Sequence, residues 1–171
     1  MNQEVLAKGI VNFEEFKRYN KYHMRKREMI AFFSFLFLFF IIFYVLMMDN
    51  FHSVIIFSIL FSIITSVLLI SAIRIVNMRF AVKEYKSEPS IKGEMTYISS
   101  EEGIRLKCES SDALFRWGEI QKAILVRDMF ILYVTTMKAI VIPTRFFDSE
   151  EDIDLFKNIV SENMDTTKVK F

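Results

Sequence analysis

The sequence predicts an α+β membrane protein, in which a hairpin of two transmembrane helices is joined to a small antiparallel β-barrel or sheet with a C-terminal helix. Two stretches, residues 29–48 and 54–73, contain no charged side chain and consist mainly of Phe, Ile, Leu and Val. Apolar residues make up 53% of the chain, which exceeds the share usual in a soluble domain. From residue 91 onward, short apolar runs separated by turn residues replace the long apolar stretches.

Residues 1–28 precede the first apolar stretch and are predicted to form a cytoplasmic strand and a basic amphipathic helix. Asn12 and Glu15 have the spacing of a capping box, in which each side chain accepts a hydrogen bond from the other residue's backbone N–H. We therefore expect a helix that begins near Phe13 and runs unbroken into the membrane. Whether residues 5–11 join the C-terminal sheet as an extra strand stays open at this point.

Each apolar stretch is long enough to cross a membrane as one helix, because twenty helical residues extend about 30 Å, the thickness of a bilayer's hydrocarbon core. A cleaved signal peptide is the alternative for the first stretch. That stretch is longer than a signal core, starts only after 28 residues and is followed by a second one. The sequence therefore predicts an uncleaved transmembrane hairpin over residues 29–76 and a helical linker over residues 77–90.

The orientation of the hairpin is predicted from the charges beside it. Residues 49–53, between the spans, contain no Lys or Arg, whereas basic residues are concentrated at the outer ends of both spans. Because such residues stay on the cytoplasmic side, we expect a multi-pass protein of the cell membrane with both termini in the cytoplasm. The same side chains suit contact with anionic lipid head groups. The residues expected to set the topology are Arg25, Lys26, Arg27, Arg74 and Arg79.

Polar side chains are few within the spans. Ser58, Ser62 and Ser66 recur every four residues, so they lie on one face of the second helix, where small side chains let another helix approach closely. The alternative is a permeation path, which requires ionisable groups facing an aqueous cavity, and neither span has one. We therefore predict that the serines pack the second span against the first or against a second copy.

Residues 91–171 are predicted to form a cytoplasmic β-rich domain that ends in a helix. The predicted strands are Lys92–Ser99, Gly103–Glu109, Ala113–Trp117, Lys122–Arg127, Met129–Thr135 and Lys138–Pro143. Ser149 then opens a helix with acidic residues in its first turn, and the apolar face of that helix should pack on the sheet. Six antiparallel strands followed by one amphipathic helix resemble a small pleckstrin-homology-like domain. The apolar face consists of Ile153, Phe156, Ile159 and Val160.

Several short motifs follow one another in this region. They are Gly103-Ile104, Trp117-Gly118-Glu119-Ile120, Phe130-Ile131-Leu132-Tyr133 and Ile140-Val141-Ile142-Pro143, followed by Arg145 and Phe147. This series resembles the YcxB-like family of bacterial proteins, which implies a short N-terminal segment, two adjacent spans and a C-terminal domain of this kind. The family usually has a basic residue after the proline, and Thr144 in that place weakens any anion-binding role of the turn. The resemblance implies no activity.

Three residues of the β-rich region are candidate contacts for a partner or for a turn, namely Trp117, Arg145 and Phe147. Trp117 leaves two interpretations open, an anchor at the edge of the core or an exposed contact for a partner. Cys108, the single cysteine, shares a predicted strand face with Ile104, and we expect it to be a small buried apolar residue.

We predict that the chain is not an enzyme and has no catalytic residue, metal site or cofactor. The sequence lacks a nucleophile paired with a base, and its two histidines, His23 and His52, are predicted on opposite sides of the membrane. None of its four glycines forms a phosphate-binding loop. The carboxylates of residues 148–154 are explained by the start of the C-terminal helix.

The predicted function is a membrane-anchored, non-catalytic module that presents its cytoplasmic domain for protein binding or regulation. Residues 91–171 carry eleven basic and fourteen acidic side chains, so we expect no nucleic-acid partner. The acidic turn at residues 99–103 disfavours phosphoinositides, and no small-molecule substrate is evident. The expected partners are the bilayer and either another protein or a second copy. The alternatives are an immunity-type protein that protects the membrane against a toxin, or an accessory subunit of a membrane enzyme or transporter.

Overall fold

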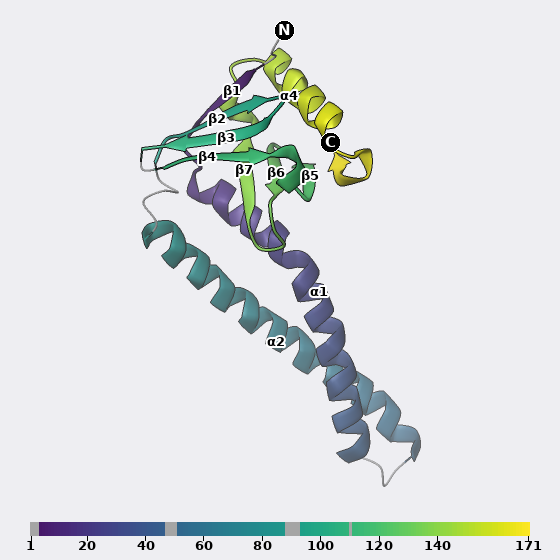
Figure 1. Ribbon diagram of the computed structural model, residues 1–171. Coiled ribbons are helices and arrows are strands. Elements are labelled where there is room, and N and C mark those ends of the chain that lie inside the picture. Colours follow the sequence, from purple (N-terminus) through teal and green to yellow (C-terminus); the bar gives the residue numbers. More distant parts are fainter. Residues whose placement is uncertain (1–3, 47–50, 88–92, 110) are drawn as a thin grey trace. The chain divides into compact units, whose positions relative to one another are not determined.

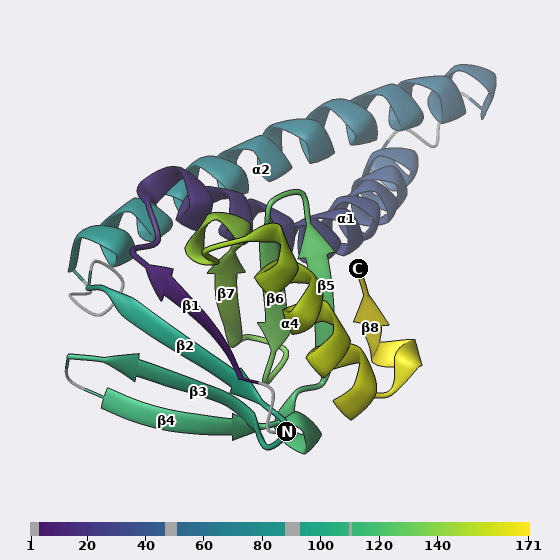
Figure 2. The ribbon, with the colours of Figure 1, turned by 90° about the horizontal axis from the view of Figure 1, so that it is seen from above.

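The computed structural model describes residues 4–46, 51–87, 93–109 and 111–171. The chain divides into two units, of which the first comprises Met1–Glu15 and Glu88–Phe171 and the second Phe16–Ser87. Figures 1 and 2 show that the second unit is a pair of long helices, and that the first contains all the strands and the C-terminal helix. The α+β class predicted from the sequence is confirmed.

Two helices account for the second unit and for the last residues before it. Helix α1 spans Phe13–Leu46 and helix α2 spans Phe51–Ser87. Both are long and apolar enough to cross a membrane. They also extend well beyond the predicted spans, as the helical flanks on either side led us to expect. Part of the connection, residues 47–50, lies outside the described residues.

The helices of the second unit run antiparallel and meet through aromatic side chains. The rings of Phe43 and Phe61 lie 5.5 Å apart, centroid to centroid. At the other end of the pair, the rings of Phe16 and Tyr85 are also 5.5 Å apart. The first contact lies within the apolar stretches, whereas the second joins the flanks of the helices outside them.

The first unit contains two four-stranded sheets. One has the order β1-β2-β3-β4 and the other the order β7-β6-β5-β8. The six predicted strands are all present, the first strand is the one that the sequence left open, and the last was not predicted. All neighbours are antiparallel except β5 and β8, which are parallel. The strands are β1 (Val5–Gly9), β2 (Met95–Ser100), β3 (Gly103–Cys108), β4 (Ser111–Arg116), β5 (Lys122–Val126), β6 (Met129–Tyr133), β7 (Ala139–Pro143) and β8 (Val169–Lys170).

Strand β1 answers the question that the sequence left open about the N-terminal segment. Val5 to Gly9 pair with β2 in a continuous antiparallel register, with Ala7 opposite Tyr97. Val5 and Ala7 are buried while Leu6 is exposed, which is the alternation expected of an edge strand with one face on the core. The N-terminal segment is therefore part of the first unit, which we call the β unit. In the sequence it is separated from the other strands by both long helices.

Tyr97 and a group of phenylalanine side chains join the two sheets and the C-terminal helix into one core. Tyr97 of β2 donates a hydrogen bond from its hydroxyl to the backbone oxygen of Val141 in β7, at 3.1 Å. Burial raises the pKa of the Tyr97 phenol, so it remains a donor at neutral pH. Phe130 of β6 packs edge-on against Phe156, with ring centroids 4.8 Å apart.

Helix α4 covers this core and spans Glu150–Asn163. It begins as predicted, because the Ser149 hydroxyl accepts a hydrogen bond from the backbone N–H of Asp152 at 3.1 Å. Its four predicted apolar residues are all buried. Three short 3-10 helices complete the unit: η1 (Trp117–Glu119), η2 (Thr144–Phe146) and η3 (Thr166–Lys168).

The turn between β2 and β3 requires its glycine. Gly103 has a φ of 152°, which side-chain-bearing residues rarely adopt. A Cβ at this position would also collide with the backbone oxygen of Phe115 in β4. The glycine therefore lets β3 approach β4 closely.

Candidate functional site: the junction at the start of α1

Helix α1 begins with the capping box predicted from the sequence. The backbone N–H of Glu15 donates to the side-chain oxygen of Asn12 at 2.9 Å, and the backbone N–H of Asn12 donates to a Glu15 carboxylate oxygen at 2.8 Å. Each residue satisfies a donor that the helix itself leaves unpaired. The helix therefore starts at a defined residue, immediately after β1.

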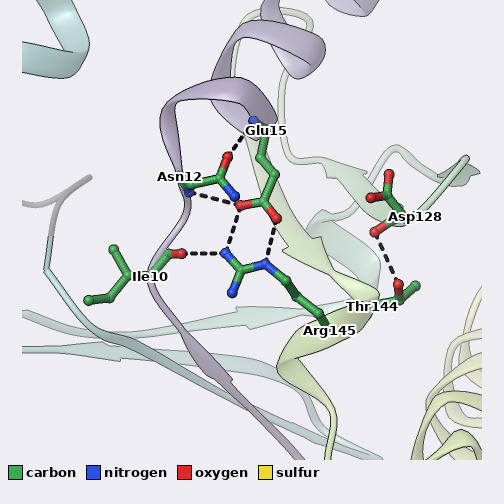
Figure 3. Close-up of polar contacts among 6 residues, drawn as sticks. All are labelled: Ile10, Asn12, Glu15, Asp128, Thr144 and Arg145. Carbon is green, nitrogen blue, oxygen red and sulfur yellow. Dashed lines mark hydrogen bonds and ion pairs between the residues drawn. The ribbon is translucent and has the colours of Figure 1, made fainter.

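Arg145 in η2 binds the same carboxylate from a distant part of the chain (Figure 3). Its Nε donates to Glu15 Oε1 at 2.7 Å, and its Nη2 donates to Glu15 Oε2 at 2.9 Å. The same Nη2 donates to the backbone oxygen of Ile10 at 2.7 Å. A planar guanidinium can make such a two-pronged contact, whereas a lysine ammonium cannot. We call Ile10, Asn12, Glu15 and Arg145 the junction.

The two charged groups of the junction differ in their access to water. The Glu15 side chain is 3% exposed, whereas that of Arg145 is 51% exposed. The hydrogen bonding of its guanidinium to the Glu15 carboxylate raises the pKa of Arg145, while partial burial opposes that rise. A buried carboxylate is costly unless it is paired and hydrogen-bonded, and Glu15 meets both conditions through Arg145 and Asn12.

Neighbouring residues hold η2 in place beneath the arginine. The backbone N–H of Thr144 donates to the backbone oxygen of Asp128 at 2.8 Å, and its hydroxyl approaches the same oxygen at 3.3 Å. The Arg145 guanidinium carbon lies 4.8 Å from the centre of the Phe146 ring. Gly9 of β1 leaves room for that ring, since a Cβ there would overlap it. Thr144 occupies the position at which the YcxB-like family usually has a basic residue, and here it has a structural role.

The junction ties three elements of the β unit to one another, namely β1, the first turn of α1 and η2. Helix α1 continues without interruption from Phe13 to Leu46, so the helix whose start is fixed here also carries the first apolar stretch. The guanidinium donates to three internal acceptor atoms, the two Glu15 carboxylate oxygens and the Ile10 backbone oxygen. The arrangement is therefore suited to fixing the first turn of the helix on the β unit and less suited to binding an anionic ligand.

The structure places the other two predicted contact residues of this domain in its interior. Trp117 is 6% exposed, and its indole N–H donates to the backbone oxygen of Ser100 at 2.9 Å. Phe147 is 8% exposed and packs against Phe130 with a ring-centroid distance of 5.9 Å. Of the two interpretations of Trp117, its burial favours the anchor at the edge of the core, and Phe147 likewise fills the core.

Cys108 lies on the predicted face of β3, but the expectation that its side chain is buried is wrong. Ile104 is buried and Leu106 is half-buried on the same face of β3, but Cys108 at the end of the strand is only half-buried. Its sulfur lies 3.2 Å from the hydroxyl oxygen of Ser111 in β4. The strand ends before the core can cover the thiol.

The predicted serine stripe lies in the interior of the helix pair. Ser58, Ser62 and Ser66 are at most 1% exposed. The Ser62 hydroxyl donates to the backbone oxygen of Ile59 at 2.8 Å. The hydroxyls of Ser58 and Ser66 have no hydrogen-bond partner within the described part of the chain. This burial is what close packing along the stripe requires.

The residues predicted to set the topology lie on the flanks of the helix pair. Arg74 of α2 forms an ion pair with Glu28 of α1, with Nε and Oε2 2.7 Å apart. Arg74 therefore also links the helices, a role that the sequence did not reveal. The remaining four are exposed: Arg25, Lys26, Arg27 and Arg79.

Sequence reasoning found both charged residues of the junction but not their contact. Glu15 was assigned to the capping box and Arg145 to a family motif, and 130 positions separate them. No local spacing rule connects residues so far apart. Within the described residues, no group of three or more His, Cys, Asp and Glu side chains could hold a metal ion.

The fold and the junction define a class of protein: an α+β unit whose N-terminal strand leads into a pair of long apolar helices. Residues 100–160 match the model of the YcxB-like protein family, and this segment runs from the end of β2 to α4. A protein of Bacillus subtilis (strain 168) described as uncharacterised protein YcxB is 35% identical over 89 residues. Over these residues the chain is therefore similar to the YcxB-like family, whose motifs its sequence resembles.

These matches cover only part of each chain. The aligned residues are 52% of this chain and 48% of the Bacillus protein, so the chain spans about half the length of that relative. The family match contains Arg145 but not Glu15. No solved structure matches the chain.

Proposed function

We propose that this chain is a multi-pass protein of the cell membrane whose two helices anchor a non-catalytic, protein-binding or regulatory β unit in the cytoplasm. The observation that carries the proposal is the exposure of large apolar side chains along both helices. Phe33 and Phe37 of α1 are 61% and 68% exposed, and Leu68 of α2 is 65% exposed. Water disfavours such surfaces strongly, whereas the interior of a bilayer covers them without cost.

The exposure of the most apolar part of each helix supports a location in a membrane over one in the core of a soluble protein. In the most apolar 18-residue window of each helix, 0% of α1 and 22% of α2 is buried. A core helix of a soluble protein would be mostly covered by its own chain. The basic residues at the outer ends of the helices favour an orientation with both termini in the cytoplasm.

A protein partner fits the β unit better than a phosphate-bearing ligand. Residues 91–171 of this unit carry more acidic than basic side chains, and the guanidinium of Arg145 already binds Glu15 and Ile10. The antiparallel strands and the C-terminal helix also support the proposal of a pleckstrin-homology-like domain. An experimental structure of the β unit would test that assignment.

Reporter fusions test the anchor and its orientation. Alkaline phosphatase, which is active only outside the cytoplasm, is fused after Phe171 in one strain and inserted after Asn50 in another. The proposal predicts activity for the second fusion only, with both proteins retained in carbonate-washed membranes. Activity after Phe171, or release of the full chain into the soluble fraction, would contradict it.

Crosslinking in native membranes tests the binding role. A tagged full-length chain should yield a discrete crosslinked species of defined stoichiometry, formed either with another protein or with a second copy. The same chain carrying a substitution in the transmembrane face, Ser66→Ala, serves as the control that leaves the β unit unchanged. A chain that stays uncrosslinked at every reagent concentration would contradict the binding role.

A further inference from the structure

Strand β4 is an open edge of the first sheet. It pairs along its full length with β3, and the sheet order places no other described strand beside it. The opposite edge differs, because α4 and η2 both contact β1. Figure 2 shows β4 as the outermost strand of its sheet. An uncovered edge presents backbone N–H and C=O groups that another strand can satisfy. In β4, the N–H of Arg116 already donates to a Glu119 carboxylate oxygen at 3.1 Å.

The side chains of β4 alternate in a way that keeps its charges on one face. Asp112, Leu114 and Arg116 point to one side of the sheet, and both charged residues are exposed. Phe115 points to the other side, where the ammonium nitrogen of Lys138 lies 5.8 Å from the ring centre. The strand thus has a charged outer face with an apolar residue at its middle.

We propose that β4 pairs with β4 of a second copy of this chain in an antiparallel register centred on Leu114. In that register each Leu114 lies opposite its counterpart, and Asp112 of each copy lies directly opposite Arg116 of the other. Directly opposed residues of an antiparallel pair share a face, so both charge pairs form on the same side. The two first sheets then become one eight-stranded sheet around a twofold axis.

The charges select this register over its neighbours. Moving the centre to Ala113 sets Asp112 opposite Leu114, and moving it to Phe115 sets Leu114 opposite Arg116. Both alternatives lose the two opposite-charge contacts. Within its own chain Asp112 forms a long, exposed ion pair, with its oxygen 3.8 Å from Arg105 Nε and both side chains about half exposed, and such a pair contributes little. The strand is therefore self-complementary in charge, which favours a second copy over an unrelated peptide.

This inference rests on the proposed protein-binding function and identifies a second copy as the partner. Crosslinking through engineered cysteines tests its geometry in native membranes. Cys108 is the single cysteine, so Cys108→Ser leaves a chain without thiols. Added to it, Leu114→Cys should form an intermolecular disulfide, because Cα atoms on the axis of an antiparallel pair lie about 4.5–5.5 Å apart. Ser111→Cys, which keeps both charges of β4, is the control, since its two copies would be about 20 Å apart along the strand.

The expected result is at least a tenfold faster formation of disulfide-linked dimer by Leu114→Cys than by Ser111→Cys. Equal rates at both positions, or no dimer at either, would overturn the proposal. A dimer trapped efficiently by Ser62→Cys in α2 but not by Leu114→Cys would also overturn it, because the copies would then meet through their helices.

Charge exchange tests the register independently. Asp112→Arg and Arg116→Asp each set like charges opposite one another twice, and each should weaken dimerisation of the full-length chain in detergent about tenfold. The double variant restores opposite charges in the same register and should recover the native dissociation constant. Lys8→Glu on β1 changes an exposed charge of the same sheet away from this edge, so it should leave dimerisation unchanged.

The double variant also separates register from folding. Recovery of the dimer shows that the single substitutions acted through the opposed charges. Single variants that dimerise like the native chain, or a double variant as weak as the singles, would overturn the proposed register. A chain that is anchored in the membrane but monomeric would overturn this inference and leave the anchor proposal intact, whereas a chain released from the membrane would overturn the anchor instead.

Discussion

Replacing Arg145 by methionine should destabilise the β unit by about 2 to 3 kcal/mol. The substitution keeps an apolar side chain over the Phe146 ring but removes the donors to Glu15 and Ile10. Breaking a buried ion pair from one side costs about 3 to 5 kcal/mol, because the remaining charge is left unpaired. Arg145 is half exposed and Glu15 keeps the N–H of Asn12, so we expect a smaller value.

The assay is urea unfolding of the full-length chain in detergent, followed by the fluorescence of Trp117. This residue is the single tryptophan and is buried in the β unit, so its emission reports unfolding of that unit. Arg105→Met is the matched control. Arg105 is 47% exposed, close to the 51% of Arg145, but its partner Asp112 is 54% exposed while Glu15 is 3% exposed. We expect the control to cost less than about 0.5 kcal/mol.

A double-mutant cycle isolates the pair itself. Glu15→Gln retains an oxygen that can accept the N–H of Asn12 but removes the charge that Arg145 binds. If the two residues act as a pair, the double variant should be less destabilised than the sum of the single variants by about 1 to 2 kcal/mol. Additive costs, or an Arg145→Met cost no larger than that of Arg105→Met, would refute the claim that a buried carboxylate makes this junction strong.

Substitutions at three further positions test other parts of the structure. Gly103→Ala should destabilise the β unit by at least about 2 kcal/mol in the same urea assay, because its φ is unfavourable and the Phe115 carbonyl blocks a Cβ. Tyr97→Phe should cost about 1 kcal/mol at neutral pH through loss of the bond to Val141. It should also reduce alkaline destabilisation, measured as the unfolding free energy against pH. Ser66→Ala should leave the thermal midpoint of the chain in detergent unchanged, since the Ser66 hydroxyl has no described partner, whereas Ser66→Leu should lower it by separating the helices.

The alkaline effect of Tyr97 has a defined sign. The folded chain holds the phenol proton more tightly than the unfolded chain, because burial raises the pKa above its ordinary value of about 10. The associated stability is fully present below about pH 10 and is lost as the pH rises further, since only the unfolded chain then releases the proton readily. Equal pH profiles for the native chain and Tyr97→Phe would contradict this account.

The substitutions at Gly103 and Ser66 also have results that would contradict the reasoning behind them. A Gly103→Ala variant as stable as the native chain would mean that the turn can adopt another backbone conformation. A Ser66→Leu variant with an unchanged thermal midpoint would mean that the stripe does not set the approach of the two helices.

The sequence was sufficient to predict elements whose signals are local. Charge-free stretches of twenty residues indicate long apolar helices, and the capping pairs at Asn12 and Ser149 mark where helices begin. Alternating residues and turn residues located six of the eight strands to within a few positions. These signals depend on neighbours within about four residues, and both helix and strand periods repeat over that distance.

The tertiary structure decided which distant residues meet. The short strand β8 has too few residues for a periodic signal, and only its parallel pairing with β5 makes it a strand. The burial of Trp117 and Phe147 likewise depends on what packs over them, and their own sequence neighbourhood is equally compatible with an exposed surface.

The junction shows this division most clearly. By itself the sequence determined that Glu15 would cap a helix and that Arg145 would follow a strand, because each role depends on adjacent residues. That the two side chains form a two-pronged ion pair was decided by the pairing of β1 with β2 and by the position of η2. A contact across 130 positions requires the folded sheets to bring its partners together, and no periodic pattern in a single chain encodes such a contact.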